Sequence, residues 1–252
     1  MRALVDMVEK GKKLSRAGIA KNLGVSRTTA STLVSRLIET GILKETGTEV
    51  DGRGRPGISL DIATERWFCV GAEYHSKQWV FVVTDLKGSI CKETTLPIPS
   101  AEPENFLEGL VQGLTAIQRE VPGRLLPAVG IGTPGLADCS SGRIIQADDL
   151  GWKEVRVSEY LKQTVGVSSY IINRHRAGGL AEARFGAGRG VHSFIYIGIG
   201  TGISAAILSE GVLLHGTTYS AGEIGHITMN TRGPECRCGK RGCLHTLASG
   251  TA

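Results

Sequence analysis

Four residues in the last part of the sequence have the side chains and the spacing of a metal site. They are His226, Cys236, Cys238 and Cys243. One imidazole and three thiolates complete the tetrahedral ligand set of structural zinc and leave no open position for catalysis. The spacing is so tight that the sulfur atoms converge only around a shared ion or in a strained disulfide. Gly239 and Gly242 permit the sharp turns that this needs. We therefore expect a structural Zn²⁺ here.

The compartment expected for the chain also favours a metal over disulfides. The sequence has no apolar run long enough to span a membrane, which takes about 18 residues or more. Its N-terminus lacks the apolar block of a signal peptide. We therefore expect a cytoplasmic protein, in which clustered cysteines favour metal binding. Cys69, Cys91 and Cys139 stand alone in apolar or loop segments, and we expect them to be buried free thiols.

The basic charge of the chain is concentrated in its first quarter. Residues 1–66 contain 12 Lys and Arg against 8 Asp and Glu, whereas residues 67–252 contain 17 against 16. This asymmetry indicates an anionic partner for the first segment. An ordinary solvated basic face would carry the same charge. The charge alone therefore does not separate an anionic partner from a solvated face, and the expected helices and strands of this segment are needed to decide.

One helix of the first segment has a face suited to DNA. Ser26 is the expected N-cap, and the helix should run to about Thr40 before Gly41 ends it. Apolar side chains form one stripe, whereas short hydroxyls with arginine at the rim form the opposite face. Such side chains reach base edges and phosphates without holding the helix away from the groove. The candidate DNA-binding residues of this helix are Ser26, Arg27, Thr28, Ser31, Thr32 and Arg36.

The elements around this helix follow the order of a helix-turn-helix. A helix over Arg16–Leu23 precedes a glycine turn and the helix that begins at Ser26. Expected strands near Gly41–Glu45 and Ile58–Leu60 flank a glycine-rich stretch, which is typical of a β-wing. Residues 1–62 therefore resemble a winged helix-turn-helix DNA-binding domain. An ordinary three-helix knob at a domain terminus is the alternative.

The tetrapeptide Arg53-Gly54-Arg55-Pro56, in the wing or linker, resembles the core of an AT-hook. Glycine permits close approach of the backbone, and proline keeps the segment extended. Arg53 and Arg55 would then fit a narrow minor groove, whose negative potential attracts arginine. A flexible linker is the alternative for these residues taken alone.

The remainder of the chain mixes short strands with helices, which predicts an α/β domain. A helix beginning at Pro103 has an apolar stripe, and a hairpin is expected around Gly200-Thr201-Gly202. The expected strands are Trp67–Ala72, Trp79–Thr84, Ile90–Leu96, Leu126–Ile131, Ser169–Ile172, Phe194–Ile199 and Ile203–Leu208, and a further expected helix is His175–Phe185.

Four motifs together resemble the ROK family of sugar kinases and sugar-responsive repressors. They are Glu223-Ile224-Gly225-His226, the run Cys236–Cys243, the GTPG loop Gly132–Gly135 and the GIGTG turn Gly198–Gly202. The N-terminal segment with its GRGRP linker is similar to the transcriptional-repressor branch, which includes xylose, glucose and N-acetylglucosamine regulators. The resemblance implies a ribonuclease H-like, actin-like ATPase fold for residues 63–252. It also implies a homodimer, or a dimer of dimers, on a palindromic operator of double-stranded DNA.

Two departures from the kinases of that family argue against an enzyme. The kinases open this fold with an Asp-x-Gly phosphate loop, whereas the corresponding turn here is Glu73–Lys77 and has no glycine to cradle phosphates. The kinases also carry Asn-Asp before the alanine-rich helix, where the aspartate activates the sugar hydroxyl. This chain has Asn173-Arg174, and arginine does not accept a proton at neutral pH. We therefore expect no catalytic residue, no ATP and no phosphorylation.

The same resemblance implies an effector pocket. On the positions that match the family's sugar contacts, it comprises Asn173, Glu223 and His226, which are retained, and Arg174, Arg176 and His245, which depart. His226 would serve both zinc and sugar. The departures introduce bases, so we hypothesise an anionic effector such as a sugar phosphate or sugar acid. A pocket that has drifted and binds nothing is the alternative.

The sequence ends where the resemblance implies further structure. Leu247–Ala252 match the start of a helix, after which ROK proteins normally continue. The ROK segment is therefore expected to be incomplete at its C-terminus and to leave apolar surface uncovered.

These features predict a sugar-responsive transcriptional repressor of the ROK type. Effector binding would move the loop that carries Glu223 and His226, change the dimer geometry and alter the spacing of the recognition helices. Two other functions stay open. One is a ROK sugar kinase with an appended DNA-binding domain, which predicts ATP turnover. The other is a regulator relieved by a protein partner.

Overall fold

A computed structural model of the chain describes residues 1–9, 14–49, 57–121 and 124–252. These residues form two compact units. The first comprises Met1–Cys69, Val83–Lys92 and Arg119–Leu126, and the second comprises Val70–Val82, Glu93–Gln118 and Pro127–Ala252. Among the described helices, none has the length and apolar character needed to cross a membrane.

The described part of the first unit contains three helices and a three-stranded antiparallel sheet. The helices are α1 (Arg2–Glu9), α2 (Arg16–Leu23) and α3 (Arg27–Glu39). The strands are β1 (Leu14–Ser15), β2 (Leu43–Glu49) and β3 (Gly57–Ile62), in the order β1-β3-β2. Leu60 pairs with Leu14 on one side of β3, and Ile62 pairs with Leu43 on the other.

Serine side chains start two of these helices, and the N-cap predicted at Ser26 is confirmed. The Ser15 hydroxyl accepts a hydrogen bond from the Gly18 amide at 3.3 Å, and the Ser26 hydroxyl accepts one from the Thr29 amide at 3.0 Å. Each bond satisfies an amide that has no partner within the first helical turn. Gly24 ends α2 with a φ of 65°, a left-handed conformation that glycine adopts readily. The turn between α2 and α3 thus follows from local residues.

One face of α3 belongs to the core of the first unit. Its predicted apolar stripe is confirmed, because Ala30, Val34 and Leu37 are buried. The core also contains Leu4, Val8, Leu14, Ile19, Ala20, Leu43, Leu60 and Ile62. The opposite face of α3 is left for other contacts. Arg53 and Arg55 lie outside the described residues.

The main sheet of the chain has five strands. They are β4 (Trp67–His75), β5 (Gln78–Asp85), β6 (Ile90–Pro97), β7 (Arg124–Thr133) and β11 (Ser168–Asn173), in the order β11-β7-β4-β5-β6. β11 runs parallel to β7, with Asn173 beside Thr133, so the carboxyl ends of both strands meet at one edge. Ligands bind at such edges of open α/β sheets.

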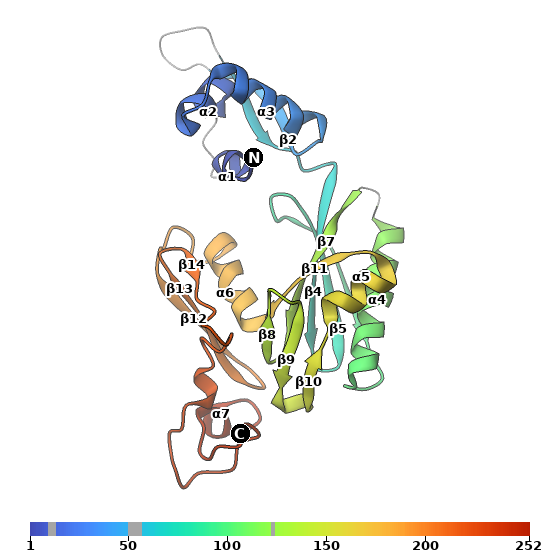
Figure 1. Ribbon diagram of the computed structural model, residues 1–252, viewed down its shortest axis with the longest axis vertical. Helices are drawn as coiled ribbons and strands as arrows, with labels where there is room; N and C mark the ends of the chain where they lie inside the picture. Colours follow the sequence, from blue (N-terminus) through green and yellow to red (C-terminus); the bar gives the residue numbers. More distant parts are fainter. Residues whose placement is uncertain (10–13, 50–56, 122–123) are drawn as a thin grey trace. The chain divides into compact units, whose positions relative to one another are not determined.

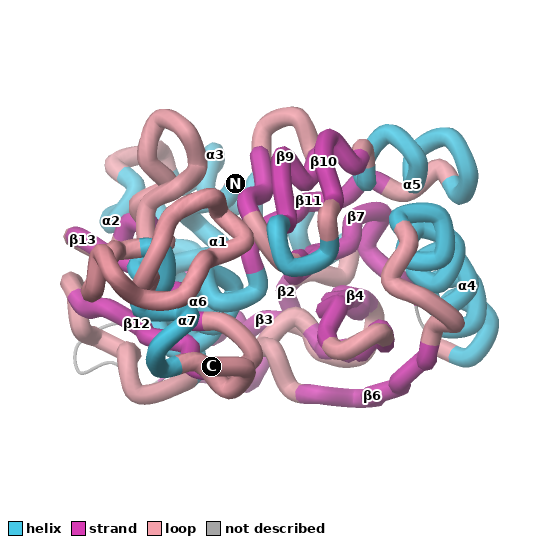
Figure 2. Tube along the Cα trace, turned by 90° about the horizontal axis from the view of Figure 1, so that it is seen from below, coloured by secondary structure: helices cyan, strands magenta, loops and turns pink. Residues whose placement is uncertain are grey.

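Helix α4 (Pro103–Glu120) lies close to this sheet because two of its glycines make room. A Cβ at Gly109 would lie 2.6 Å from Ile98, and a Cβ at Gly113 would lie 2.1 Å from the Phe81 ring. These glycines are one helical turn apart and therefore share a face. Figure 2 shows α4 alongside the strands of the sheet.

A second, smaller sheet precedes β11. It consists of β8 (Leu136–Asp138), β9 (Arg143–Ala147) and β10 (Trp152–Val155), in the order β10-β9-β8, and η1 (Asp148–Leu150) and α5 (Val157–Val165) lie after β9 and β10. The sequence analysis does not predict these elements. Strands of three to five residues are too short for an alternating pattern to stand out.

The other half of the second unit is a helix on a three-stranded sheet. It contains α6 (Arg174–Phe185), β12 (Phe194–Ile199), β13 (Ile203–Ser209) and β14 (Val212–Leu213), in the strand order β12-β13-β14. The predicted hairpin of β12 and β13 is confirmed. Gly179 lets α6 approach β13, since a Cβ there would lie 2.3 Å from Ala206. Ile195, Ile197 and Ile199, at alternate positions of β12, are 53–72% exposed. In Figure 1, α6 lies between the β12–β14 sheet and the main sheet, and α4 lies on the other side of the main sheet.

The environments of the isolated cysteines differ from the prediction. Cys91 is exposed, and Cys69 and Cys139 are half-buried. The prediction of a buried Cys91 is wrong because β6 is the edge strand of the main sheet, where no further strand covers it.

Candidate functional site

A cleft of about 910 Å³ opens in the second unit beside the carboxyl ends of β7 and β11. The segments lining it include the Ser76–Lys77 turn, the loop after β7, η1, the start of α6, the turn after β12, η2 (Ile224–His226) and α7 (Leu244–Ala248). Its volume falls within the range of small-molecule sites.

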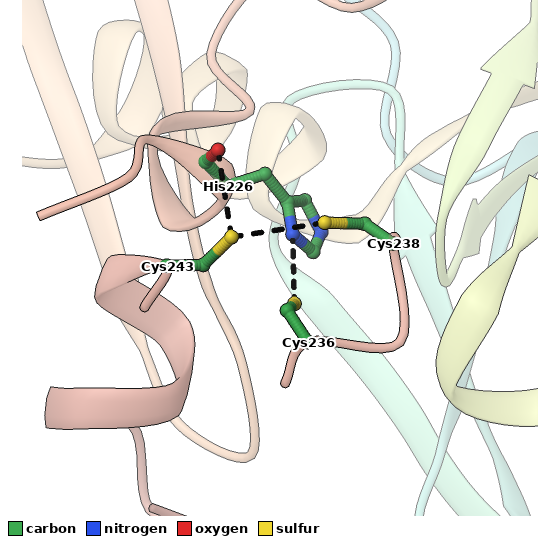
Figure 3. Close-up of side chains that lie close together, drawn as sticks. All are labelled: His226, Cys236, Cys238 and Cys243. Carbon is green, nitrogen blue, oxygen red and sulfur yellow. Dashed lines mark hydrogen bonds between the residues drawn. The ribbon is translucent and has the colours of Figure 1, made fainter. Parts of the chain in front are cut away.

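Figure 3 shows that the side chains of the four predicted metal ligands point toward one another, and three of them, His226, Cys236 and Cys238, also line the cleft. Their nitrogen and sulfur donors all lie within 4.8 Å of one another. The His226 Nδ1 is 3.5 Å from the Cys236 Sγ, and the Cys238 Sγ is 3.7 Å from the Cys243 Sγ. Bond lengths of about 2.3 Å for Zn–S and about 2.0 Å for Zn–N place tetrahedral donors about 3.5–3.8 Å apart. The two distances fit a zinc ion and exclude a disulfide between Cys238 and Cys243.

Tight turns in the surrounding loop bring these ligands together. Gly239 and Gly242 have φ values of 85° and 59°, so both occupy the left-handed region predicted for them. A Cβ at Gly242 would lie 1.6 Å from the Asn230 carbonyl oxygen, which no other residue type tolerates. Burial raises the pKa of the Cys243 thiol, and a bound cation would offset that cost by favouring the thiolate.

Asn173 links the loop after β7 to the start of α6. Its Oδ1 accepts hydrogen bonds from the amides of His175 and Arg176 at 2.9 and 3.3 Å. Its Nδ2 donates to the Gly135 carbonyl at 2.9 Å. The side chain therefore fixes the wall of the cleft in addition to lining it.

Arg174 bridges two turns on opposite sides of the cleft. Its Nη1 lies 2.5 Å from the His75 Nδ1 and 3.9 Å from a Glu73 carboxylate oxygen, and its Nη2 donates to the Thr201 hydroxyl at 3.3 Å. The guanidinium thus occupies the space between the β4–β5 turn and the turn after β12.

The β4–β5 turn is a two-residue hairpin built without glycine. Ser76 and Lys77 both have positive φ, at 51° and 59°. This is the backbone of a type I′ turn, which is suited to the twist of the flanking strands. Its side chains line the cleft, so it presents no bare backbone to a ligand.

Arg176 does not line the cleft, unlike the other predicted effector residues. It is 1% exposed, and its Nη2 donates to the carbonyls of Tyr219 and Ala221 at 2.5 and 2.6 Å. The structure therefore places this side chain behind the loop that leads to Glu223.

Glu223, His226 and His245 all line the cleft. Burial raises the pKa of the Glu223 carboxyl, and its Oε1 is buried with no hydrogen-bond partner among the described residues. The rings of His226 and His245 lie nearly parallel, with centroids 5.9 Å apart. An unpartnered carboxylate oxygen beside a cleft is suited to accept a hydroxyl group of a ligand.

Several cleft residues were missed by the sequence analysis. Asp148 and Asp149 follow β9, and His75, Lys77 and Thr201 belong to the two turns bridged by Arg174. The adjacent aspartates before Leu150-Gly151-Trp152 lie in a loop segment, where binding residues are often found, but their types and spacing alone do not mark a site.

The predicted DNA-binding side chains of the first unit differ in their surroundings. Arg27, Thr28, Thr32 and Arg36 are exposed on α3. Ser26 is used as the N-cap, and Ser31 is half-buried. Arg16, which the sequence analysis did not single out, donates from α2 to the Ser31 carbonyl at 3.1 Å and to the Ser35 hydroxyl at 2.9 Å. This arrangement holds α2 against one side of α3.

Comparisons with known proteins place these features in a family. The ROK family profile matches residues 69–252. A putative xylose repressor from Caldicellulosiruptor sp. (strain Rt8B.4) is 30% identical over 239 residues, covering 94% of this chain and 60% of that protein. The transcriptional dual regulator NagC of Escherichia coli (strain K12) is 27% identical over 254 residues, covering 99% and 62%. The chain thus spans 60–62% of the length of these relatives.

Solved structures agree in fold. A ROK family transcriptional regulator, described as a homologue of E. coli MLC, superposes with a TM-score of 0.85 at 24% identity, covering 99% of this chain and 64% of that one. A ROK family glucokinase from Streptomyces griseus, in complex with glucose and AMPPNP, superposes with a TM-score of 0.66 at 27% identity, covering 73% and 57%. The regulator therefore matches nearly the whole chain. The kinase matches 73% of it, which is about the length of the segment 69–252 that the ROK profile matches.

Proposed function

The chain belongs to the ROK family, and on that basis we propose that it is a DNA-binding transcriptional repressor of sugar-metabolism genes, controlled by a sugar or sugar derivative in a non-catalytic cleft. One observation carries the proposal. The named repressors match 94–99% of this chain, including the first unit, whereas the glucokinase covers 73%. Such a repressor would act in the cytoplasm.

In this proposal the N-terminal residues 1–62 form a winged helix-turn-helix domain, and residues 63–252 form the sugar-binding ROK domain. Helix α3 enters the major groove, and β2 and β3 form the wing. Thr28 and Thr32 are exposed on the side of α3 that the core leaves free, with Arg27 and Arg36 at the rim. Ser26 is exposed and caps α3, Ser31 is half-buried, and Arg53 and Arg55 would read the adjacent minor groove.

Zinc would stabilise the effector loop without taking part in chemistry. His226, Cys236, Cys238 and Cys243 would hold it with four protein ligands, which is the closed arrangement of a structural site. The loop then presents His226 and Glu223 to the cleft. Asn173, Arg174 and His245 complete the proposed effector contacts.

Kinase activity is disfavoured by two features of the same cleft. By the resemblance to the kinases, Arg174 takes the position of their base, and a guanidinium stays protonated at neutral pH. The β4–β5 turn presents side chains, and Arg174 bridges it to Thr201. Substituting Arg174→Asp should therefore create no sugar-dependent ATP hydrolysis, because the phosphate-binding turn is missing as well. ATP turnover by the wild-type chain would favour the kinase alternative.

The mixed lining of the cleft favours an effector that carries an anionic group. Glu223 and Asp148 are suited to accept hydrogen bonds from sugar hydroxyls, whereas Arg174 and Lys77 are suited to a phosphate or carboxylate. Calorimetry with glucose and N-acetylglucosamine and their 6-phosphates tests this point. Tighter binding of the phosphates is expected, and equal or tighter binding of the neutral sugars would refute the anionic effector.

Sugar binding would control the protein through geometry. Moving the loop that carries Glu223 would change the arrangement of a homodimer, and with it the spacing of two recognition helices on a palindromic operator. DNA affinity measured with and without the bound sugar tests this mechanism. An affinity that responds to no sugar but to a protein partner would favour the third alternative.

A further inference from the structure

Arg176 is a buried cation in the first turn of α6, and no part of the proposed function requires its charge at that depth. Only 1% of it is exposed. Removing a guanidinium from water is costly unless the surroundings supply acceptors or an opposite charge. Its acceptors are backbone carbonyls of one short segment, Tyr219 and Ala221.

The same segment is also held by β13. The Gly222 carbonyl accepts hydrogen bonds from the Ala205 amide at 2.7 Å and the Ser204 hydroxyl at 3.2 Å. A Cβ at Gly222 would lie 2.0 Å from the Ala205 carbonyl oxygen, so the two backbones are in close contact. Arg176 and β13 therefore both hold residues 219–222 by hydrogen bonds to their backbone carbonyls.

The backbone of this segment needs such support. Tyr219 has a φ of 57°, a left-handed conformation that is unfavourable for a residue with a side chain. Its hydroxyl donates to the Ser140 hydroxyl at 3.1 Å, which adds a contact with the turn after β8. A strained residue persists when its surroundings fix it, and the Arg176 hydrogen bond to the Tyr219 carbonyl does so directly.

The 219–222 segment leads to the residue with the unpartnered carboxylate. Glu223 follows Gly222, and its Oε1 has no hydrogen-bond partner among the described residues. The charges of Arg176 and Glu223 act on each other, since each favours the ionised form of the other. The buried guanidinium thus supplies both hydrogen bonds for the loop and a counter-charge for the carboxylate.

We propose that Arg176 is a positioning residue of the effector site, which fixes the 219–222 segment and thereby holds the Glu223 carboxylate toward the cleft. The proposal rests on the proposed function only for the identity of the effector. It assigns to Arg176 no contact with the ligand, because the side chain does not line the cleft.

Amide hydrogen exchange tests the positioning role without any ligand. Arg176→Met should speed exchange at residues 219–224 at least tenfold and leave β12 and α4 unchanged. Arg176→Lys retains the charge and one donor group, and should restore part of the protection. Arg184→Met, on the exposed part of the same helix, is the control and should leave the segment unchanged. If Arg176→Met fails to fold, Arg176→Gln replaces it, since its amide can still donate to a carbonyl.

Calorimetry with xylose, N-acetylglucosamine and their phosphates supplies the second readout. For the sugar that binds the wild-type chain most tightly, Arg176→Met should weaken binding at least tenfold, and Arg176→Lys should recover part of the loss. Unchanged exchange at 219–224, or unchanged affinity despite faster exchange, would overturn the proposal. Failure of every sugar to bind the wild-type chain would count against the proposed function, and hydrogen exchange would then still decide the role of Arg176.

Discussion

At the scale of single residues, Arg174 links two segments of the cleft wall. Its guanidinium contacts His75 at the end of β4 and Thr201 after β12. The sequence predicted this residue as a departure from the kinases, and the structure adds what its guanidinium contacts. Its partners could not be predicted, because His75 and Thr201 are distant in sequence and reach it through the fold.

Zinc content is the first prediction at this scale. Cys243→Ser should remove the metal and lower the free energy of unfolding by several kcal/mol, because metal binding and local folding are linked. Metal analysis by mass spectrometry should find about one zinc per wild-type chain and none in the variant. Cys91→Ser is the control, since Cys91 is exposed and outside the cluster. Full zinc retention in Cys243→Ser would contradict the site.

The pH dependence of stability is the second prediction. Burial, with the nearby charges of Arg174 and His75, lowers the pKa of His175 to about 4. An unfolded histidine has a pKa of about 6.5, so the neutral form is favoured in the folded chain. The stability that comes from keeping His175 neutral is fully present above pH 6.5 and is lost as the pH falls toward 4. At pH 5 the loss in the free energy of unfolding amounts to roughly 1–2 kcal/mol.

The measurement for His175 is denaturant unfolding at pH 7.5 and pH 5. The wild-type chain should lose more stability between these values than His175→Gln does. The same loss in both proteins would show that other groups cause the acid sensitivity.

At the scale of elements, close packing of α4 depends on glycine. Gly113→Ala would place a methyl group 2.1 Å from the buried Phe81 ring. Alanine gains about 1 kcal/mol of helix propensity, but overpacking costs about 1–3 kcal/mol. We expect a net destabilisation, measured by thermal unfolding. Gly130→Ala in β7 is the control, because no atom lies within 4 Å of its added Cβ. A stabilised Gly113→Ala would contradict the packing of α4.

Helix α3 allows stability and DNA binding to be separated. Ser26→Ala removes the N-cap and should cost about 1 kcal/mol of stability. Thr32→Ala should leave stability nearly unchanged, because Thr32 is exposed and its hydroxyl donates only to the Thr28 carbonyl. If α3 reads DNA, Thr32→Ala should still weaken specific binding by on the order of 1 kcal/mol. Unfolding curves measure the stability, and fluorescence anisotropy measures the DNA affinity. An unchanged DNA affinity of Thr32→Ala would show that Thr32 is not part of the recognition surface.

The elements also show which features a sequence predicts well. Caps and long apolar stripes were sufficient for α2, α3 and α4, since these signals lie within a few residues of each other. The short strands β8, β9 and β10 were missed, because pairing between distant residues stabilises them more than local preference does. The convergence of His226 with three cysteines was predictable from their types and spacing. The burial of Arg176 was not, because it depends on a loop more than forty positions away, at Tyr219 and Ala221.

At the scale of the whole molecule, we propose that the first unit binds DNA and that the second unit binds the effector. The uneven charge agrees with this division, since residues 1–66 carry 12 basic against 8 acidic side chains. The match of the named repressors along 94–99% of the chain supports the same combination. The central claim is therefore that this chain recognises a specific DNA sequence.

Selection of binding sites from random duplex DNA tests that claim most directly. The account predicts enrichment of one sequence motif, with A·T-rich flanks where Arg53 and Arg55 would enter the minor groove. A palindrome would indicate binding as a dimer, whereas a single half-site would indicate recognition by one copy. Arg36→Ala should reduce the enrichment. The absence of any enriched motif would contradict sequence-specific DNA recognition. Equal enrichment by the wild-type chain and by a variant with both Arg36→Ala and Thr32→Ala would contradict recognition through α3.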